Sequence, residues 1–300
     1  MRPTRSPQHA RVTVRGRVRA LAVAFLLAVL AGCGGSSAAS LSPPRTIDGS
    51  YRSHALRGTV HYRVFLPAGY ASGSRHYPVV YLLHGLPAAP DAYRSIGFVT
   101  RPVEHSGMRA VVVGPQGARK GDTDPEWADR GPGRDWETAT ARELVHVIDS
   151  RYRTIPARRA RALIGISAGG YGATLIAIHN PSVYSVVQSW SGYFHATNPA
   201  GTARLDLGSK DANDWADAST LVPRLKRIFT RYPNTHYGHF VGTNDPTFLD
   251  DNRAFDRKLS AAGIRHAYAE YDGGHTDGFW RMHEDDWVMA ALRQLARPQS

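Results

Sequence analysis

Residues 162–172 read ALIGISAGGYG and join an apolar run to a run of small residues. The first part, Ala162 to Ile164, is short and continuously apolar, which is typical of a strand covered on both faces. Ser167 follows in a G-x-S-x-G pattern, and the segment beyond it, up to His179, reads as a helix. A serine on such a sharp strand-to-helix turn needs neighbours without side chains to make room for it. The stretch therefore predicts that Ser167 is an exposed nucleophile at the end of a β-strand.

Six further runs rich in apolar residues predict strands, at residues 59–66, 79–83, 110–113, 184–187, 239–241 and 266–271. Between them, apolar residues recur at helical spacing in residues 138–152, 255–262 and 287–295. Gly263 is the predicted C-terminal cap of the second helix. Strands that alternate with helices imply a mostly parallel central sheet with helices on both faces. The expected fold class is therefore α/β, and 300 residues with 42% apolar composition can build one such domain.

A serine nucleophile needs a histidine base, which in α/β enzymes of this kind follows the serine and the acid along the chain. The histidines after Ser167 are His179, His195, His236, His239, His266, His275 and His283. His179 falls late in the predicted helix, and three others fall at or in predicted strands, so structural roles are expected for them. His275 follows the last predicted strand in the sequence DGGH, where a loop can bring it over the sheet edge. We therefore expect His275 to be the base.

The acid is expected just beyond the carboxyl end of a strand, where parallel sheets build their sites. Asp245 fits this position, because the apolar run 239–241 leads directly into the sequence GTND. Asp250 and Asp251 compete with it. They precede the predicted helix that carries Phe255, where acidic residues are common as N-caps. Asp245 is favoured for this reason.

An oxyanion hole requires two backbone N–H groups. The residue after the nucleophile, Ala168, is expected to supply one of them. The other should come from a loop after an early strand, and residues 83–87, LHGLP, form such a loop. The N–H of Leu86 is the predicted second donor.

Residues 114–136 are rich in glycine, aspartate and proline and show no periodicity. Irregular segments of this length in compact domains are often functional. They are therefore expected to form a long loop near the site.

The first 32 residues differ from the rest of the chain. Six arginines come first, and an apolar run from Ala20 to Leu30 follows, too short to cross a bilayer comfortably. This order is typical of a removable export signal. The signal ends in LAGC, which resembles the lipobox of bacterial lipoproteins, and Cys33 is the only cysteine of the chain. Lipidation of Cys33 would attach the protein to the outer face of the bacterial cytoplasmic membrane, with plain secretion as the alternative.

The expected organisation is a lipoprotein-type signal peptide at 1–32, a flexible tether at 33–50 and one catalytic domain at 51–300. The arginines of the signal, which has no acidic residue, account for half of the formal net charge of +12. The remaining basic residues are scattered, with the densest group at 158–161. A solvated basic surface is expected rather than a nucleic-acid partner.

Four segments together resemble the esterase D family of α/β-hydrolases, namely YPVVYLLHG at 77–85, GISAGG at 165–170, GTND at 242–245 and GGH at 273–275. That family includes S-formylglutathione hydrolases, bacterial feruloyl and acetyl esterases, and secreted mycolyltransferases. The similarity extends over about residues 60–295. It implies an α/β-hydrolase fold with Ser167 as nucleophile, His275 as base, Asp245 as acid, and Leu86 and Ala168 as oxyanion donors.

Two features depart from the family pattern. Many relatives carry methionine after the nucleophile where this chain has Ala168; the oxyanion donor there is backbone, so the change affects the acyl pocket rather than the hole. In mycolyltransferases the acid is a glutamate near the position of Asp250. Asp250 is therefore the second candidate for the acid.

The expected function is carboxylic-ester hydrolysis through an acyl-enzyme on Ser167, with a small-molecule or carbohydrate ester as substrate and no cofactor. One alternative is acyl transfer to a sugar or lipid alcohol, and another is a surface-attached binding protein without catalysis. The histidines and acids between 275 and 286 match no metal-ligand spacing, so no metal is expected. Candidates for an acyl pocket, with burial in the core as the alternative, are Trp127, Trp136, Tyr171, Trp190, Phe194 and Trp280.

Overall fold

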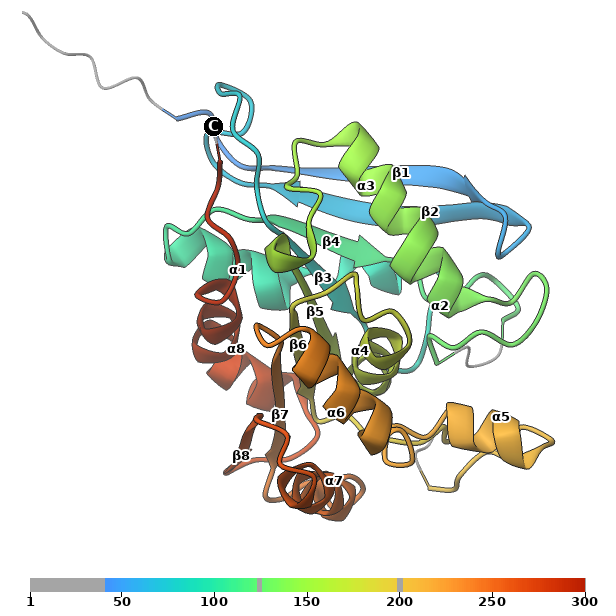
Figure 1. Cartoon of the computed structure of the whole chain (residues 1–300). Coiled ribbons are helices and arrows are strands. Elements are labelled where there is room, and N and C mark those ends of the chain that lie inside the picture. The colour runs from blue at the N-terminus through green and yellow to red at the C-terminus, as the bar shows by residue number, and fades with distance from the viewer. Residues whose placement is uncertain (1–40, 123–125, 199–201, 300) are drawn as a thin grey trace, which may run out of the picture. The chain divides into compact units, whose positions relative to one another are not determined.

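The computed structural model describes residues 41–122, 126–198 and 202–299 (Figure 1). Within these residues, eight strands form one sheet in the order β1-β2-β4-β3-β5-β6-β7-β8. The neighbours β1–β2 and β2–β4 are antiparallel, and all other neighbours are parallel. The predicted α/β class with a mostly parallel sheet is confirmed. The strands are β1 (Arg45–Ser53), β2 (Gly58–Leu66), β3 (Val79–Leu83), β4 (Val111–Pro115), β5 (Arg161–Ile166), β6 (Val186–Trp190), β7 (His236–Gly242) and β8 (Ala267–Tyr271).

The two faces of the sheet carry separate apolar cores, because successive side chains of a strand point to opposite faces. In β3, for example, Val80 and Leu82 belong to one core and Tyr81 to the other. Helices α1 (Gly97–His105) and α8 (Asp277–Leu292) cover the face of Val80 and Leu82. Arg101 of α1 and Glu284 of α8 join these helices through a bidentate ion pair.

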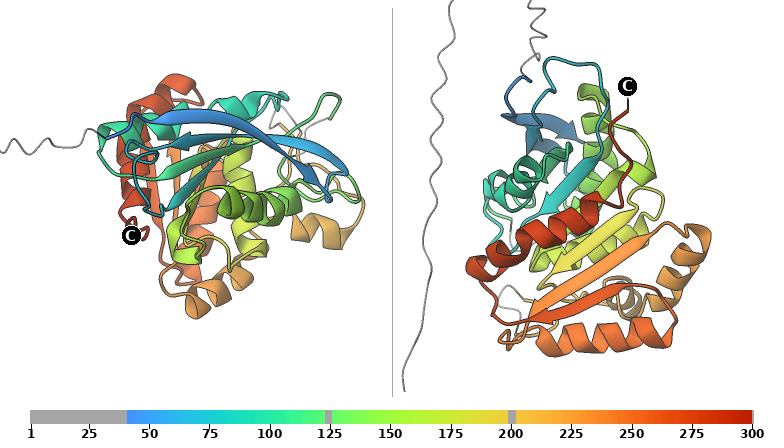
Figure 2. Two further views of the ribbon diagram at one scale, coloured as in Figure 1. Left: turned by 90° about the horizontal axis from the view of Figure 1, so that it is seen from above. Right: turned by 90° about the vertical axis from the view of Figure 1, so that its left-hand side faces the viewer.

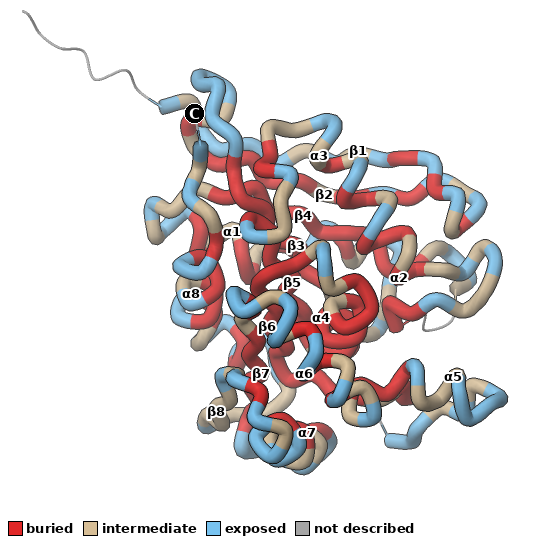
Figure 3. Tube along the Cα trace, in the orientation of Figure 1, coloured by how far each residue is buried: buried red, intermediate tan, exposed pale blue. Residues whose placement is uncertain are grey.

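The opposite face is covered by more helices (Figure 2). α4 (Ala168–His179) is buried along nearly its whole length (Figure 3), as a helix with apolar residues on all sides should be. The other helices of this face are α2 (Trp136–Thr138), the π-helical η2 (Ala139–Leu144), α3 (Val145–Arg151), α6 (Val222–Arg231) and α7 (Leu249–Ala261). Two short 3₁₀ turns, η1 (Ala92–Arg94) and η3 (Arg158–Ala160), and helix α5 (Lys210–Trp215) complete the described elements.

Every strand that the apolar runs predict is present, with ends that differ by a few residues. The helix predicted at 138–152 corresponds to the continuous run from α2 to α3. Gly263 follows α7 with a φ of +68°, as a C-terminal cap requires. The last helix begins at Asp277, about ten residues earlier than its periodicity indicates. Helices α1, α5 and α6 were not predicted, although Val222, Leu225 and Ile228 of α6 have helical spacing.

The expected tether is wrong at its end, because Arg45 to Ser50 belong to β1. This strand pairs with β2 along its full length, and of its nine residues only Tyr51 and Ser53 are buried. An exposed edge strand held by backbone hydrogen bonds carries no apolar pattern that a sequence could reveal. The expected signal peptide, Cys33 and the first part of the tether lie outside the described residues. No helix of the described segments has the length and apolar character needed to cross a bilayer.

Candidate active site

Ser167 stands at a sharp turn between β5 and α4. Its φ of +57° and ψ of −121° are strained for a residue with a side chain. The turn closes tightly: a Cβ added at Gly165 would lie 1.9 Å from the carbonyl oxygen of Gly169. Glycine is therefore required at position 165 for the turn to form. The result is a hydroxyl held at the carboxyl edge of the sheet, as the G-x-S-x-G pattern predicts.

The structure brings Ser167, His275 and Asp245 together, although they follow three different strands. His275 Nε2 lies 2.9 Å from Ser167 Oγ, and His275 Nδ1 lies 2.9 Å from Asp245 Oδ2. The other carboxylate oxygen of Asp245 accepts the backbone N–H groups of Thr247 and Phe248 at 3.2 and 3.1 Å. Asp245 is fully buried, and these donors satisfy its charge. With Nδ1–H donated to Asp245, the lone pair of Nε2 faces the serine hydroxyl.

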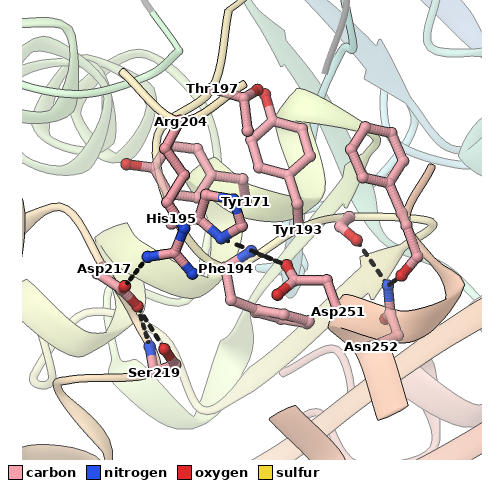
Figure 4. Close-up of polar contacts among 12 residues, drawn as sticks. Tyr171, Tyr193, Phe194, His195, Thr197, Arg204, Asp217, Ser219, Asp251 and Asn252 are labelled. Carbon is pink, nitrogen blue, oxygen red and sulfur yellow. Dashed lines mark hydrogen bonds and ion pairs between the residues drawn. The ribbon is translucent and has the colours of Figure 1, made fainter. Parts of the chain in front are cut away.

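The competing acids lie elsewhere. The side chain of Asp250 is 99% exposed and lies 3.8 Å from Arg253 Nη1, whereas the carboxylate that contacts His275 belongs to Asp245. Asp251 accepts the backbone N–H of Phe194 at 2.9 Å and lies 3.6 Å from His195 Nδ1 (Figure 4). Burial raises the pKa of Asp251. Both residues lie within the first turn of α7, which begins at Leu249, so the expected N-cap role is wrong; Phe248 is the N-cap, and the acidic residues instead favour the helix through its N-terminal dipole.

The two expected oxyanion donors lie near Ser167, one in its pocket and one next to it in the chain. Ala168 is the first residue of α4, whose N-terminal N–H groups lack acceptors within the helix and favour negative charge nearby. Leu86 lines the same pocket as Ser167. Leu86 thus shares the pocket of Ser167, and Ala168 follows the serine at the N-terminus of α4.

A pocket of about 380 Å³ opens onto Ser167 and His275. Its walls are mostly apolar, and the polar side chains other than those of Ser167 and His275 come from His84, Ser95 and Asp277. Of the aromatic residues proposed from sequence, Trp280 lines this pocket, whereas Trp136, Tyr171, Trp190 and Phe194 are buried in the cores. The apolar lining consists of Leu82, Leu86, Pro87, Ala92, Phe98, Ile166 and Trp280.

The imidazole of His275 is held by two aromatic rings. Phe248 packs on it at 5.1 Å between ring centroids, and Trp280 stands edge-on to it at 5.1 Å. The indole N–H of Trp280 donates to Ser191 Oγ at 3.0 Å, which fixes the orientation of the ring. These contacts confine the imidazole, while 29% of its side chain remains exposed to the pocket.

The irregular segment 114–136 reaches the site through Trp127. Its indole N–H donates to the backbone oxygen of His84 at 3.1 Å, and the two rings lie 4.8 Å apart. Burial lowers the pKa of His84 to about 4, so its imidazole is neutral at pH 7. Trp127 thus supports the loop that carries Leu86, in agreement with the expected position of this segment near the site.

Sequence reasoning missed Ser95, Phe98 and Asp277. Phe98 lies on α1, whose buried residues Phe98, Val99, Pro102 and Val103 have helical spacing; this was the available signal, although a proline within a helix weakens it. Asp277 lies only two residues after His275, and this proximity is the signal that could have indicated it.

The sheet is mostly parallel, and its site joins a serine on a strand-to-helix turn to a histidine and a buried aspartate. This combination defines the α/β-hydrolase class. A model of the family "Putative esterase" matches residues 53–283, and the chain belongs to that family.

Curated relatives agree with this assignment. An esterase of Mycobacterium tuberculosis is 28% identical over 276 residues, which cover 83% of this chain and 60% of the relative. This chain thus spans about 60% of the length of that relative. A diacylglycerol acyltransferase/mycolyltransferase of Mycobacterium leprae is 26% identical, with 70% of this chain and 67% of the relative covered.

Solved structures show the same fold. A ferulic acid esterase superposes with a TM-score of 0.70 and 25% identity over 84% of this chain and 98% of its own. An S-formylglutathione hydrolase from Agrobacterium tumefaciens superposes with a TM-score of 0.67 and 20% identity, over 86% of this chain and all of its own.

Proposed function

We propose that this chain hydrolyses carboxylic esters through an acyl-enzyme on Ser167. The observation that carries the proposal is the unbroken series of contacts from Asp245 through His275 to the serine hydroxyl, at 2.9 Å each. Such a series lets the histidine take the serine proton while the aspartate keeps the imidazole in the required tautomer.

The first half of the reaction forms the acyl-enzyme. Ser167 Oγ attacks the ester carbonyl and gives its proton to His275 Nε2. Asp245 stabilises the resulting imidazolium, and the N–H groups of Leu86 and Ala168 stabilise the oxyanion. When the tetrahedral intermediate collapses, His275 returns the proton to the leaving alcohol. In the second half, water gives a proton to His275 and attacks the acyl carbon. When the second tetrahedral intermediate collapses, the acid leaves and His275 returns the proton to Ser167 Oγ.

Replacement of the nucleophile tests this proposal. Ser167→Ala should lower kcat on p-nitrophenyl acetate or butyrate by at least about a thousandfold. Ser150→Ala, at an exposed serine on α3, is the control and should keep the parent activity. Activity of Ser167→Ala within tenfold of the parent would mean that the nucleophile is assigned wrongly.

Acyl transfer is the second candidate, supported by the 26% identity to the diacylglycerol acyltransferase/mycolyltransferase. The same acyl-enzyme would then react with a sugar or lipid alcohol in place of water. Product analysis with an added alcohol acceptor separates the two, because transfer gives a new ester and hydrolysis gives free acid. A binding protein without catalysis would show neither product.

The substrate is proposed to be a small-molecule or carbohydrate ester. A mostly apolar pocket of about 380 Å³ beside Ser167 suits a short acyl or aryl group. Rates with esters of increasing acyl length and with a feruloyl ester would define the preference.

We also propose that the protein is exported and attached to the membrane through lipid on Cys33. The basic and apolar leader followed by LAGC supports this. Expression of the full chain and of Cys33→Ser in a bacterial host, followed by fractionation, tests the anchor. The parent chain should be found with the membranes and the variant in the soluble exported fraction; equal distribution would contradict lipidation.

A further inference from the structure

A second cluster of chemically active side chains lies apart from Ser167, between β7, α7 and β8. It consists of His239 on β7, Asp256 on α7 and His266 directly before β8. One nitrogen or oxygen from each of the three lies within 4.8 Å of the others. His239 is fully buried, while 29% of the side chain of Asp256 is exposed, so the cluster can be reached from solvent.

The hydrogen bonds of His239 define which of its nitrogens carries the proton. The side-chain amide of Asn252 donates to the backbone oxygens of Gly192 and Phe248 at 2.7 and 2.9 Å (Figure 4). Its Oδ1 is therefore an acceptor, and His239 Nδ1 at 3.1 Å must be the donor. The lone pair of a neutral His239 is then on Nε2, which is buried and has no hydrogen-bond partner. A buried acceptor without a partner is costly.

The same reasoning applies to His266. Its Nδ1 lies 2.8 Å from the backbone oxygen of Ile264, which can only accept, so Nδ1 carries a proton. Its Nε2 lies 2.9 Å from Asp256 Oδ1. In the neutral imidazole this places a lone pair against a carboxylate oxygen. A proton, on the imidazole or on the carboxyl group, or a metal ion must lie between them.

We propose that His239, Asp256 and His266 bind a divalent transition-metal ion, with zinc as the best fit. Two imidazole nitrogens and one carboxylate oxygen form a donor set that zinc prefers, and water can complete a tetrahedron. Each imidazole donates its other N–H to an oxygen, which is the arrangement that orients metal-bound histidines. A simple ion pair between His266 and Asp256 would leave the lone pair of His239 unused, whereas a metal uses all three groups.

The expected role of the ion is structural. It would join β7 to α7, the two elements that bracket Asp245, and Asn252 links the cluster to the backbone of Phe248 beside that aspartate. Metal binding should therefore stabilise the fold and the position of Asp245 without contact with the ester.

Cobalt titration of the full chain, purified without a histidine tag and stripped with chelator, tests the site. One equivalent of Co²⁺ per chain should give the visible absorption of a four-coordinate site, and Zn²⁺ should displace it. Zn²⁺ should also raise the Tm of the stripped protein, because binding to the folded state alone stabilises it.

Variants assign the ligands. Asp256→Asn, on a partly exposed helix position, and His239→Phe, which keeps a ring in the aromatic core, should each weaken Co²⁺ binding by roughly tenfold or more. Asp250→Asn and His146→Asn, both at exposed positions, should leave binding unchanged. Ser167→Ala should also bind one equivalent, so this result is independent of the proposed esterase reaction. Absence of Co²⁺ binding, or equal binding by Asp256→Asn, would show that the cluster is an ion pair only.

Discussion

The indole ring of Trp280 stands edge-on to the imidazole of His275, with 5.1 Å between the ring centroids. The indole is itself fixed by its hydrogen bond to Ser191. We expect Trp280→Ala to lower kcat by about tenfold to a hundredfold. The imidazole of His275 loses an aromatic packing contact in this variant and can shift relative to Ser167. Steady-state kinetics on a p-nitrophenyl ester measure this. Trp215→Ala, at an exposed tryptophan on α5, should leave kcat unchanged.

Asp245→Asn should reduce kcat by about four orders of magnitude. The asparagine amide would donate to His275 Nδ1 and force the proton onto Nε2, where it blocks proton transfer from the serine. The matched Asp250→Asn variant should keep the parent kcat, because that side chain lies in solvent. A large loss in Asp250→Asn with little loss in Asp245→Asn would reverse the assignment of the acid.

Gly165→Ala should destabilise the protein by about 3 kcal/mol or more and abolish activity, since its Cβ would overlap the backbone of Gly169 at 1.9 Å. Urea unfolding of the soluble variant measures the free energy. Gly73→Ala is the control, because its Cβ would lie 3.5 Å from the nearest backbone atom. Equal stability of the two variants would show that the turn at Ser167 is looser than described.

Stability should fall between pH 6.5 and pH 4 in part because of His84. Burial lowers its pKa to about 4 in the folded protein, whereas the unfolded chain retains a pKa near 6.5. The unfolded state therefore binds the extra proton in this window, and stability that is complete above pH 6.5 is lost as the pH falls. The slope from one such group is at most about 1.4 kcal/mol per pH unit. Urea unfolding of His84→Asn should show a shallower slope than that of the exposed-site control His146→Asn; equal slopes would argue against a buried neutral imidazole.

The elements around Ser167 could be predicted because local rules decide them. A strand covered on both faces is a short apolar run, and the turn that follows it needs glycine. Asp245 and His275 each follow a strand, and the parallel arrangement brings the ends of those strands to one edge. The distances between the three side chains, in contrast, depend on the packing of Phe248 and Trp280 around the imidazole.

Other features were not visible in the sequence for physical reasons. β1 is exposed and held by backbone pairing, so it carries no apolar signal. Phe98 lines the pocket of Ser167 because α1 packs beside α8 on one face of the sheet, and Ser95 lines it from the end of the preceding turn η1. From the sequence, Asp245 could be favoured as the acid, but Asp250 could not be excluded. The two carboxylates differ in burial, and only the folded chain determines burial.

The most direct test of the account is intact-mass and peptide mass spectrometry of the protein after reaction with a fluorophosphonate. The contacts of Ser167 with His275 predict one adduct per chain on Ser167, no adduct in Ser167→Ala, and slow labelling in His275→Ala. An unlabelled parent protein, or an adduct that persists in Ser167→Ala, would contradict the central claim.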